Sequence, residues 1–130
     1  MLILDTDVLI EIERKNERIT DSVEKLREKH PENPAVSSAI YAEVYYGCLV
    51  LPEKSKEILN ILESLEILSF DKDVAKIFSQ LKLNLNKRGM PIPAFDLITA
   101  STAIKENATV VSLDTHFKNV PNLKLILLEQ

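Results

Sequence analysis

The amino-acid sequence predicts a single α/β domain in which a short parallel β-sheet is flanked by helices on both faces. Three observations lead to this prediction. Short apolar runs alternate along the chain with longer segments of helical spacing. The 130 residues, 45% of them hydrophobic, can form one substantial core but leave no room for a second, so one domain is expected over residues 1–130. Only two glycines and six prolines interrupt the chain, which favours regular elements joined by short connections.

The first elements expected are a buried strand and two helices. An apolar triplet at residues 2–4 is too short for a helix and ends abruptly at Asp5, which is typical of a buried strand. Thr6 or Asp7 can then cap a short helix. Apolar residues at helical spacing predict a second helix, which ends where two prolines follow. These helices are expected over residues 6–14 and 17–29.

The middle of the chain predicts a second strand followed by two helices. After a strand at residues 35–37, Ser37 or Ser38 is placed to cap a helix that stops before Pro52. Pro52 itself suits the first turn of the next helix, which is strongly amphipathic as far as Leu65.

The remaining residues again alternate between strands and helices. Asp71 or Asp73 can cap a long helix that ends near Gly89. Runs of β-branched and apolar residues indicate short buried strands on either side of the helices. In this part of the chain we expect strands at residues 67–70, 109–113 and 123–128, and a further helix at 93–106.

Charge and cysteine content limit the classes of function. A net charge of −4 and a pI near 5.2 argue against indiscriminate binding of nucleic acid, which normally relies on a broad basic surface. Basic residues gather at residues 14–29 and 82–88, either as local positive surface or as solvated helix faces. The single cysteine, Cys48, excludes a disulfide framework and favours a reducing compartment. With no basic leader and no apolar window of membrane-spanning length, a cytoplasmic protein is expected.

Two aspartates, Asp5 and Asp114, directly follow predicted strands. In open parallel sheets, functional groups gather just beyond the carboxyl ends of the strands. Two acids directed at one crevice suggest a bound cation, although an acid after a strand is also a common helix cap.

Two further acids lie in predicted helices. Glu43 is flanked by Ile40, Val44 and Gly47, which are expected to face inward, and a lone carboxylate buried among them would need a partner. A solvent-facing Glu43 is the alternative. Asp96 lies in the first turns of its helix, where an acid interacts favourably with the helix dipole without any function. Its neighbours are almost entirely apolar, however, so this helix is expected to be buried.

The four carboxylates together point to a divalent cation. If they converge, their repulsion raises their pKa values and disfavours folding unless a cation neutralises them. Oxygen ligands favour Mg²⁺ or Mn²⁺, and the sequence has neither the cysteines nor the paired histidines of a zinc site. One or two such ions about 4 Å apart can activate water and stabilise an in-line displacement at phosphorus. The reaction implied is phosphodiester hydrolysis.

Four segments carry a resemblance to a known family: LILDTDVLI, SSAIYAEVYYG, IPAFDLITASTAI and ATVVSLDTHFKNVPNL. In order and spacing they resemble the PIN domains of VapC-like toxins over essentially the whole chain. The resemblance implies a PIN-like fold and an endoribonuclease that depends on Mg²⁺ or Mn²⁺. The acidic ligands that it implies, acting directly or through water, are Asp5, Glu43, Asp96 and Asp114.

The resemblance also assigns expectations to two other residues. Thr6 matches the hydroxyl position beside the first acid, where it would bond a water molecule or an acid at the metal, although a plain helix cap would look the same. His116 falls where such proteins often carry another polar residue, but we favour its interpretation as a histidine in a surface loop.

The partners implied by the resemblance are an RNA substrate, a small antitoxin and a second copy of the chain. Antitoxins of this type usually occupy the site, often with a basic side chain, and the toxins commonly form homodimers. The apolar stripes at residues 58–65 and 74–85 could supply a partner surface, but they would look the same in an ordinary core.

Three rival interpretations remain. The string DTDVL also resembles the opening motif of haloacid-dehalogenase-type phosphatases, with Asp5 as nucleophile and Asp7 as acid/base, but the chain is too short for a cap and Glu43 and Asp96 would be unexplained. A receiver domain shares the length and the alternation, but its acid pair and late lysine are not evident. The third rival is a PIN fold that only binds RNA or protein, against which the intact acidic quartet argues.

Overall fold

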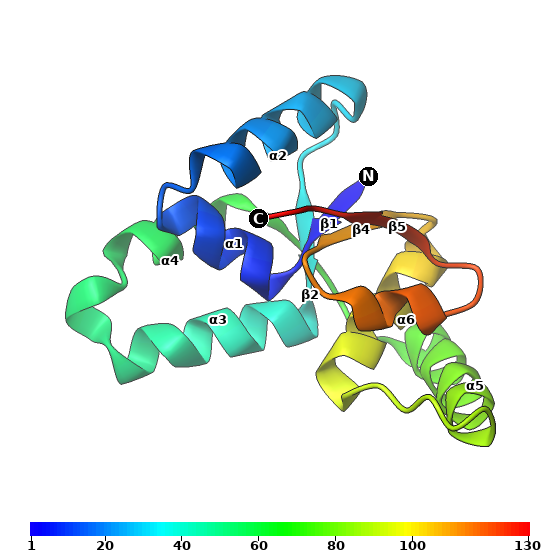
Figure 1. Ribbon diagram of the computed structural model, residues 1–130. Coiled ribbons are helices and arrows are strands. Elements are labelled where there is room, and N and C mark those ends of the chain that lie inside the picture. Colours follow the sequence, from blue (N-terminus) through cyan, green and yellow to red (C-terminus); the bar gives the residue numbers. More distant parts are fainter.

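The computed structural model describes residues 1–130 as one five-stranded sheet with helices on both sides (Figure 1). All strand pairs are parallel, in the order β3-β2-β1-β4-β5. The predicted fold class, a short parallel sheet flanked on both faces, is confirmed. The strands are β1 (Leu2–Leu4), β2 (Ala35–Ser37), β3 (Glu66–Leu68), β4 (Thr109–Ser112) and β5 (Lys124–Leu127).

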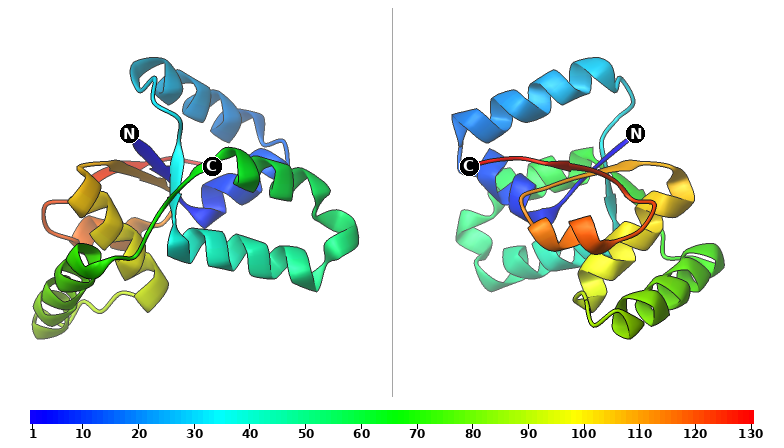
Figure 2. Two further views of the ribbon diagram at one scale, coloured as in Figure 1. Left: turned by 180° about the vertical axis from the view of Figure 1, so that it is seen from behind. Right: turned by 45° about the vertical axis from the view of Figure 1, so that its right-hand side comes forward.

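Six α-helices and two short 3-10 turns complete the chain. Helices α5 and α6 pack against each other on one side of the sheet, whereas α1 contacts α2 and α4 on the other (Figures 1 and 2). Helix α3 contacts both α4 and α6. None of the helices combines the length and the apolar character that a membrane crossing needs. The helices are α1 (Thr6–Glu13), α2 (Glu17–Lys29), α3 (Ser38–Val50), α4 (Lys56–Ser64), α5 (Lys72–Lys87) and α6 (Ala94–Glu106), and the turns are η1 (Pro52–Lys54) and η2 (Thr115–Asn119).

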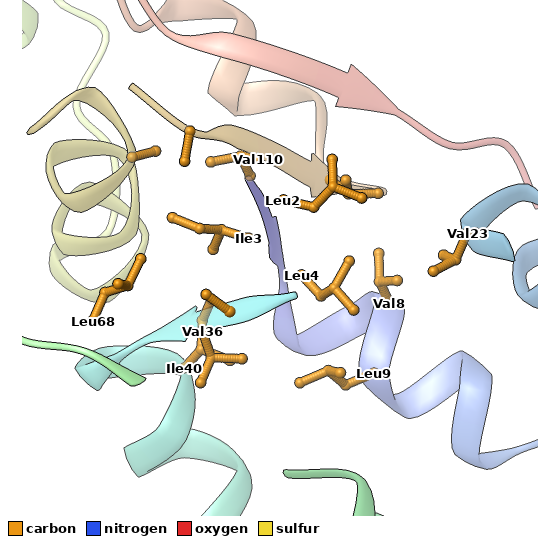
Figure 3. Packing of buried hydrophobic residues seen from close by; sticks show 14 of the residues in the cluster. Leu2, Ile3, Leu4, Val8, Leu9, Val23, Val36, Ile40, Leu68 and Val110 are labelled. Atoms are coloured by element: carbon orange, nitrogen blue, oxygen red, sulfur yellow. The ribbon is translucent and has the colours of Figure 1, made fainter. Parts of the chain in front are cut away.

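The central strand β1 lies in the main core. All three of its residues are buried, and they belong to a cluster of 17 buried residues that also includes Val8 and Leu9 of α1 and Ile40 of α3 (Figure 3). A second cluster of six buried residues joins α5 and α6 to Phe117 of η2. Because strands on both sides and apolar side chains fix β1, the residue at its carboxyl end has a defined position.

The start of α1 differs from the prediction. The N-cap is Asp5, whose side chain accepts the Thr6 N–H at 2.9 Å, so the prediction of Thr6 or Asp7 as the cap is wrong. The physical reason is that Asp5 continues β1: its backbone is extended (φ −71°, ψ 160°), and its N–H donates to the carbonyl of Val111 at 3.0 Å. The same aspartate therefore ends the strand and starts the helix.

The caps of α3 and α5 agree with the sequence. The hydroxyl of Ser37 accepts the N–H of Ile40 at 3.2 Å, and the carboxylate of Asp71 accepts the N–H of Val74 at 3.0 Å. In each case one of the two predicted capping residues is used. Helix α3 consequently begins immediately after β2, at the same edge of the sheet as Asp5.

Two other boundaries were predicted imperfectly. Strand β3 ends at Leu68 rather than at residue 70, because its pairing with the three-residue strand β2 runs out where Ser37 opposes Leu68. Pro52 begins the separate turn η1 rather than α4, since the Ser55 hydroxyl donates to the Leu51 carbonyl and closes this turn. The turn η2 was not predicted at all.

Candidate active site

Five carboxylates and one hydroxyl line an open cleft of about 270 Å³ at the carboxyl edge of the sheet. They come from the end of β1, from α1, α3 and α6, and from the segment after β4. All four acids predicted from the sequence, together with Thr6, lie in this cleft. The lining residues are Asp5, Thr6, Asp7, Ile10, Glu43, Asp96 and Asp114.

Asp5 is the most buried of these acids, with 5% of its surface exposed. Its Oδ2 accepts the Ser112 hydroxyl at 2.7 Å, and its Oδ1 accepts the Thr6 N–H at 2.9 Å. Burial raises the pKa of Asp5, the two hydrogen bonds oppose this shift, and the charge of Asp114 adds to it. Each oxygen keeps a second lone pair for a ligand in the cleft.

Ser112, the last residue of β4, connects two of the acids. Besides donating to Asp5, its buried hydroxyl accepts the N–H of Asp114 at 2.9 Å. One side chain thus holds the acids that follow β1 and β4 in a fixed relation. The sequence analysis missed this residue, although a serine at the end of an otherwise apolar strand was an available signal.

Glu43 reaches the cleft from α3, but not in the predicted way. The predicted burial is confirmed for Ile40 and Val44 and wrong for Gly47, which is exposed, and Glu43 adopts the solvent-facing alternative. The reason is that α3 extends past the edge of the sheet (Figure 1), and a Cβ added to Gly47 would meet nothing within 4 Å. Partial burial of the Glu43 carboxylate raises its pKa, the charge of Asp96 raises it further, and the Thr6 hydroxyl donates to it at 3.3 Å.

Asp96 and Asp114 are connected by His116. The Nδ1 atom of His116 lies 2.8 Å from Oδ1 of Asp114, and its Nε2 atom lies 3.0 Å from Oδ2 of Asp96. Burial raises the pKa of Asp96, and so does the charge of Asp5. The interpretation of His116 as a surface-loop residue is therefore wrong. The turn η2, which directs the ring toward the acids, has no recognised signal in the sequence.

Asp7 is the acid that the sequence analysis left out of the site. Its Oδ2 accepts the N–H of Leu113 at 3.3 Å, and its Oδ1 is buried without a hydrogen-bond partner. Burial and the charge of Asp5 raise the pKa of Asp7 to about 6. The spacing of two acids around Thr6 is a signal for Asp7 in the sequence, but the same spacing also fits a helix cap or a phosphatase motif.

A family model for the PIN domain matches residues 2–123. The chain belongs to the PIN domain family. The resemblance seen in the four sequence segments is thereby confirmed, and the interpretations as a haloacid-dehalogenase-type phosphatase or a receiver domain are not retained. This PIN domain is similar to Ribonuclease VapC2 of Rickettsia felis, with 40% identity over 97 residues that cover 70% of this chain and 71% of the relative. It is also similar to Toxin FitB of Neisseria gonorrhoeae, with 34% identity over 128 residues that cover 88% of each chain.

Solved structures share the whole fold of this PIN domain. A chain in the crystal structure of VapBC2 from Rickettsia felis, bound to a DNA fragment from their promoter, superposes with a TM-score of 0.86 at 31% identity over 98% of both chains. A chain in the structure of FitAB bound to IR36 DNA gives a TM-score of 0.84 at 26% identity, covering 100% of this chain and 99% of that chain. The likeness therefore includes all the elements that carry the acidic cleft.

PIN ribonucleases generally depend on a divalent metal ion, and the donors in this cleft suit one. Carboxylate oxygens are the ligands that hard divalent cations prefer. The unpartnered Oδ1 of Asp7 and the raised pKa values of its neighbours are the features that a cation would relieve. Asp96, Asp114 and His116 each bring a ligand atom to within 4.8 Å of the others. The residues present thus fit a divalent cation.

Proposed function

We propose that this protein is a metal-dependent endoribonuclease that hydrolyses RNA phosphodiester bonds and acts as the toxin of a toxin–antitoxin pair. The observation that carries the proposal is the convergence of carboxylates from separate elements of the fold in one open cleft. Its relatives named as a ribonuclease and as a toxin support the same conclusion.

The proposed ligands of the ion are four acids, acting directly or through water. A bound Mg²⁺ or Mn²⁺ ion would activate water for attack on phosphorus and stabilise the charge that develops on the phosphate oxygens. The residues of the chain orient these ligands: Ser112 fixes Asp5, and Thr6 donates to Glu43. Asp7 adds negative charge beside Asp5 and strengthens the attraction for a cation. The proposed ligands are Asp5, Glu43, Asp96 and Asp114.

RNA binding at this cleft requires compensation of charge. Five carboxylates face the same space in a chain of net charge −4, so without an ion the phosphate backbone would be repelled. Arg14 and Lys54 line an adjoining groove between α1, α3 and α4, where they can contact phosphates that flank the scissile bond. The ion and these two side chains together would place the backbone across the acids.

The same groove is the proposed binding surface of an antitoxin. It has a volume of about 250 Å³ and shares Thr6, Ile10 and Glu43 with the acidic cleft. Close by on α3, Tyr46 and Leu49 are 69% and 64% exposed, which is unusual for apolar side chains of this size. An amphipathic partner segment could cover these residues and extend a basic side chain into the cleft.

A homodimer is a separate part of the proposal. The predicted partner stripes at residues 58–65 and 74–85 mainly face the core, since Leu62, Val74 and Leu81 are buried. Two other apolar residues are exposed: Phe95 near the start of α6 and Leu83 on α5. Their exposure supports a second copy binding at α5 and α6 instead. Light scattering during size-exclusion chromatography of the isolated chain tests this expectation directly.

The deciding experiment is cleavage of total cellular RNA by the purified protein and by Asp96→Asn, with Mg²⁺, with Mn²⁺ and with chelator. Sequencing of the fragment ends would show whether the cuts are discrete. We expect cuts that disappear with chelator and in the variant. RNA binding without cleavage under every metal condition would instead identify a PIN fold that only binds RNA.

A further inference from the structure

His116 contacts both the acids of the cleft and the adjoining apolar cluster. Its Nδ1 lies 2.8 Å from Oδ1 of Asp114, and its backbone N–H donates to the same oxygen at 3.2 Å. The ring also packs against the buried ring of Phe117, with the two centroids 4.9 Å apart. These contacts fix both the place and the direction of the imidazole.

The second nitrogen of the ring has no hydrogen-bond partner. Nε2 of His116 is buried and points at the cleft, where Oδ2 of Asp96 lies 3.0 Å away without forming an aligned hydrogen bond. An imidazole nitrogen that carries no proton presents a lone pair, which can accept a hydrogen bond or bind a metal ion. Nε2 and the Asp96 oxygen, 3.0 Å apart, are close enough for one cation to bind both.

We propose that Nε2 of His116 is a direct ligand of the divalent cation, so that the site combines carboxylate oxygens with one imidazole nitrogen. This inference rests on the proposed function and adds a ligand outside the acidic quartet. Adjacent ligands of a six-coordinate ion with bonds of about 2.1 Å lie about 3.0 Å apart, which agrees with the separation of Nε2 from the Asp96 oxygen. A histidine ligand whose other nitrogen faces a carboxylate is a common arrangement at metal sites, and the Asp114 carboxylate lies 2.8 Å from Nδ1 of His116.

The nitrogen ligand has a consequence for the choice of metal. Imidazole binds transition-metal ions more strongly than Mg²⁺, which prefers oxygen. We therefore expect His116→Asn to weaken Mn²⁺ binding roughly tenfold and Mg²⁺ binding much less, as measured by calorimetric titration of the full chain. His116→Gln serves as a second variant, and circular dichroism checks that both remain folded.

The direct test is pulsed electron paramagnetic resonance of the Mn²⁺-loaded protein, which detects a nitrogen nucleus bonded to the ion. The chain has only two histidines, so His30→Asn, at the distant end of α2, is a matched control. We expect imidazole coupling in the wild type and in His30→Asn, and its loss in His116→Asn. No RNA is needed for this measurement.

The possible failures are distinguishable. Bound Mn²⁺ without nitrogen coupling in the wild type would overturn the role of His116 and leave the proposed nuclease intact. Tighter Mn²⁺ binding by His116→Asn would also overturn it, because the ring would then compete with the metal. A wild-type protein that binds no divalent cation would overturn both this inference and the proposed function.

Discussion

The two sides of the acidic cleft are held in different ways. On the side of β1, Asp5 is buried and both of its oxygens accept hydrogen bonds from the protein. On the side of α6 and η2, Asp96 and Asp114 are partly exposed, and His116 is their shared polar neighbour. The first side is attached to the main core and the second to the smaller cluster around Phe117. We infer that the Asp5 side sets the position of the site, whereas the opposite side depends more on the bound ion.

The largest expected effect is loss of cleavage when an acid on either side becomes an amide. Asp5→Asn and Asp96→Asn should each reduce the RNA cleavage rate by at least about 100-fold, because each loses a proposed metal ligand. Neither should destabilise the metal-free fold, since each also removes repulsion within the cluster. Asp21→Asn, at an exposed position on α2, is the matched control. Wild-type turnover by either cleft variant would show that the site is wrong.

The next largest effect concerns Ser112, which connects the two sides of the cleft through its hydrogen bonds to Asp5 and Asp114. Ser112→Ala leaves the Asp5 carboxylate and the Asp114 N–H without a buried partner. We expect a loss of about 1–2 kcal/mol in the free energy of unfolding and of roughly tenfold in cleavage. Urea denaturation and cleavage kinetics measure the two. Ser112→Thr, which keeps the hydroxyl, should recover most of both, and an alanine variant equal to the wild type would refute the connecting role.

The acids of the cleft were more predictable from the sequence than the orientation of the side chains around them. Asp5 and Asp114 were predicted because each directly follows an apolar strand. Glu43 and Asp96 were predicted because each lies in a helical segment that resembles the PIN domain family. The orientation of side chains was less predictable. The orientation of His116 depends on the turn η2, whose Phe117 packs with α5 and α6 in the smaller cluster, and the exposure of Gly47 depends on where the sheet ends. Such features arise from tertiary packing rather than from local sequence patterns.

A smaller effect is a pH dependence from Asp7. Its pKa in the folded chain, about 6, lies above the ordinary value of 3.8. Between these values the folded state keeps a proton that the unfolded state has lost, so the stability that Asp7 contributes falls as the pH rises from about 4 to about 6 and stays low above it. Because the side chain is partly exposed, we expect Asp7→Asn to stabilise the metal-free protein by on the order of 1 kcal/mol at pH 7 and by little at pH 4.

Urea denaturation in chelator from pH 4 to pH 8 measures this difference. Asp21→Asn should run parallel to the wild type over the whole range, whereas the curves of Asp7→Asn and the wild type should separate as the pH rises. A constant offset between the Asp7→Asn and wild-type curves would show that the effect of Asp7 is not one of proton binding.

The smallest expected effect concerns the hydroxyl of Thr6. Its bond to Glu43 is 3.3 Å long and solvent-exposed, so it orients a carboxylate that α3 already brings into the cleft. Thr6→Val, which keeps the shape and removes the hydroxyl, should slow cleavage by no more than about threefold and change stability by less than about 0.5 kcal/mol. Thr6→Ser should match the wild type in single-turnover kinetics. A loss in Thr6→Val as large as that in Asp96→Asn would mean that the hydroxyl acts on the ion or on the attacking water itself, rather than only orienting the Glu43 carboxylate.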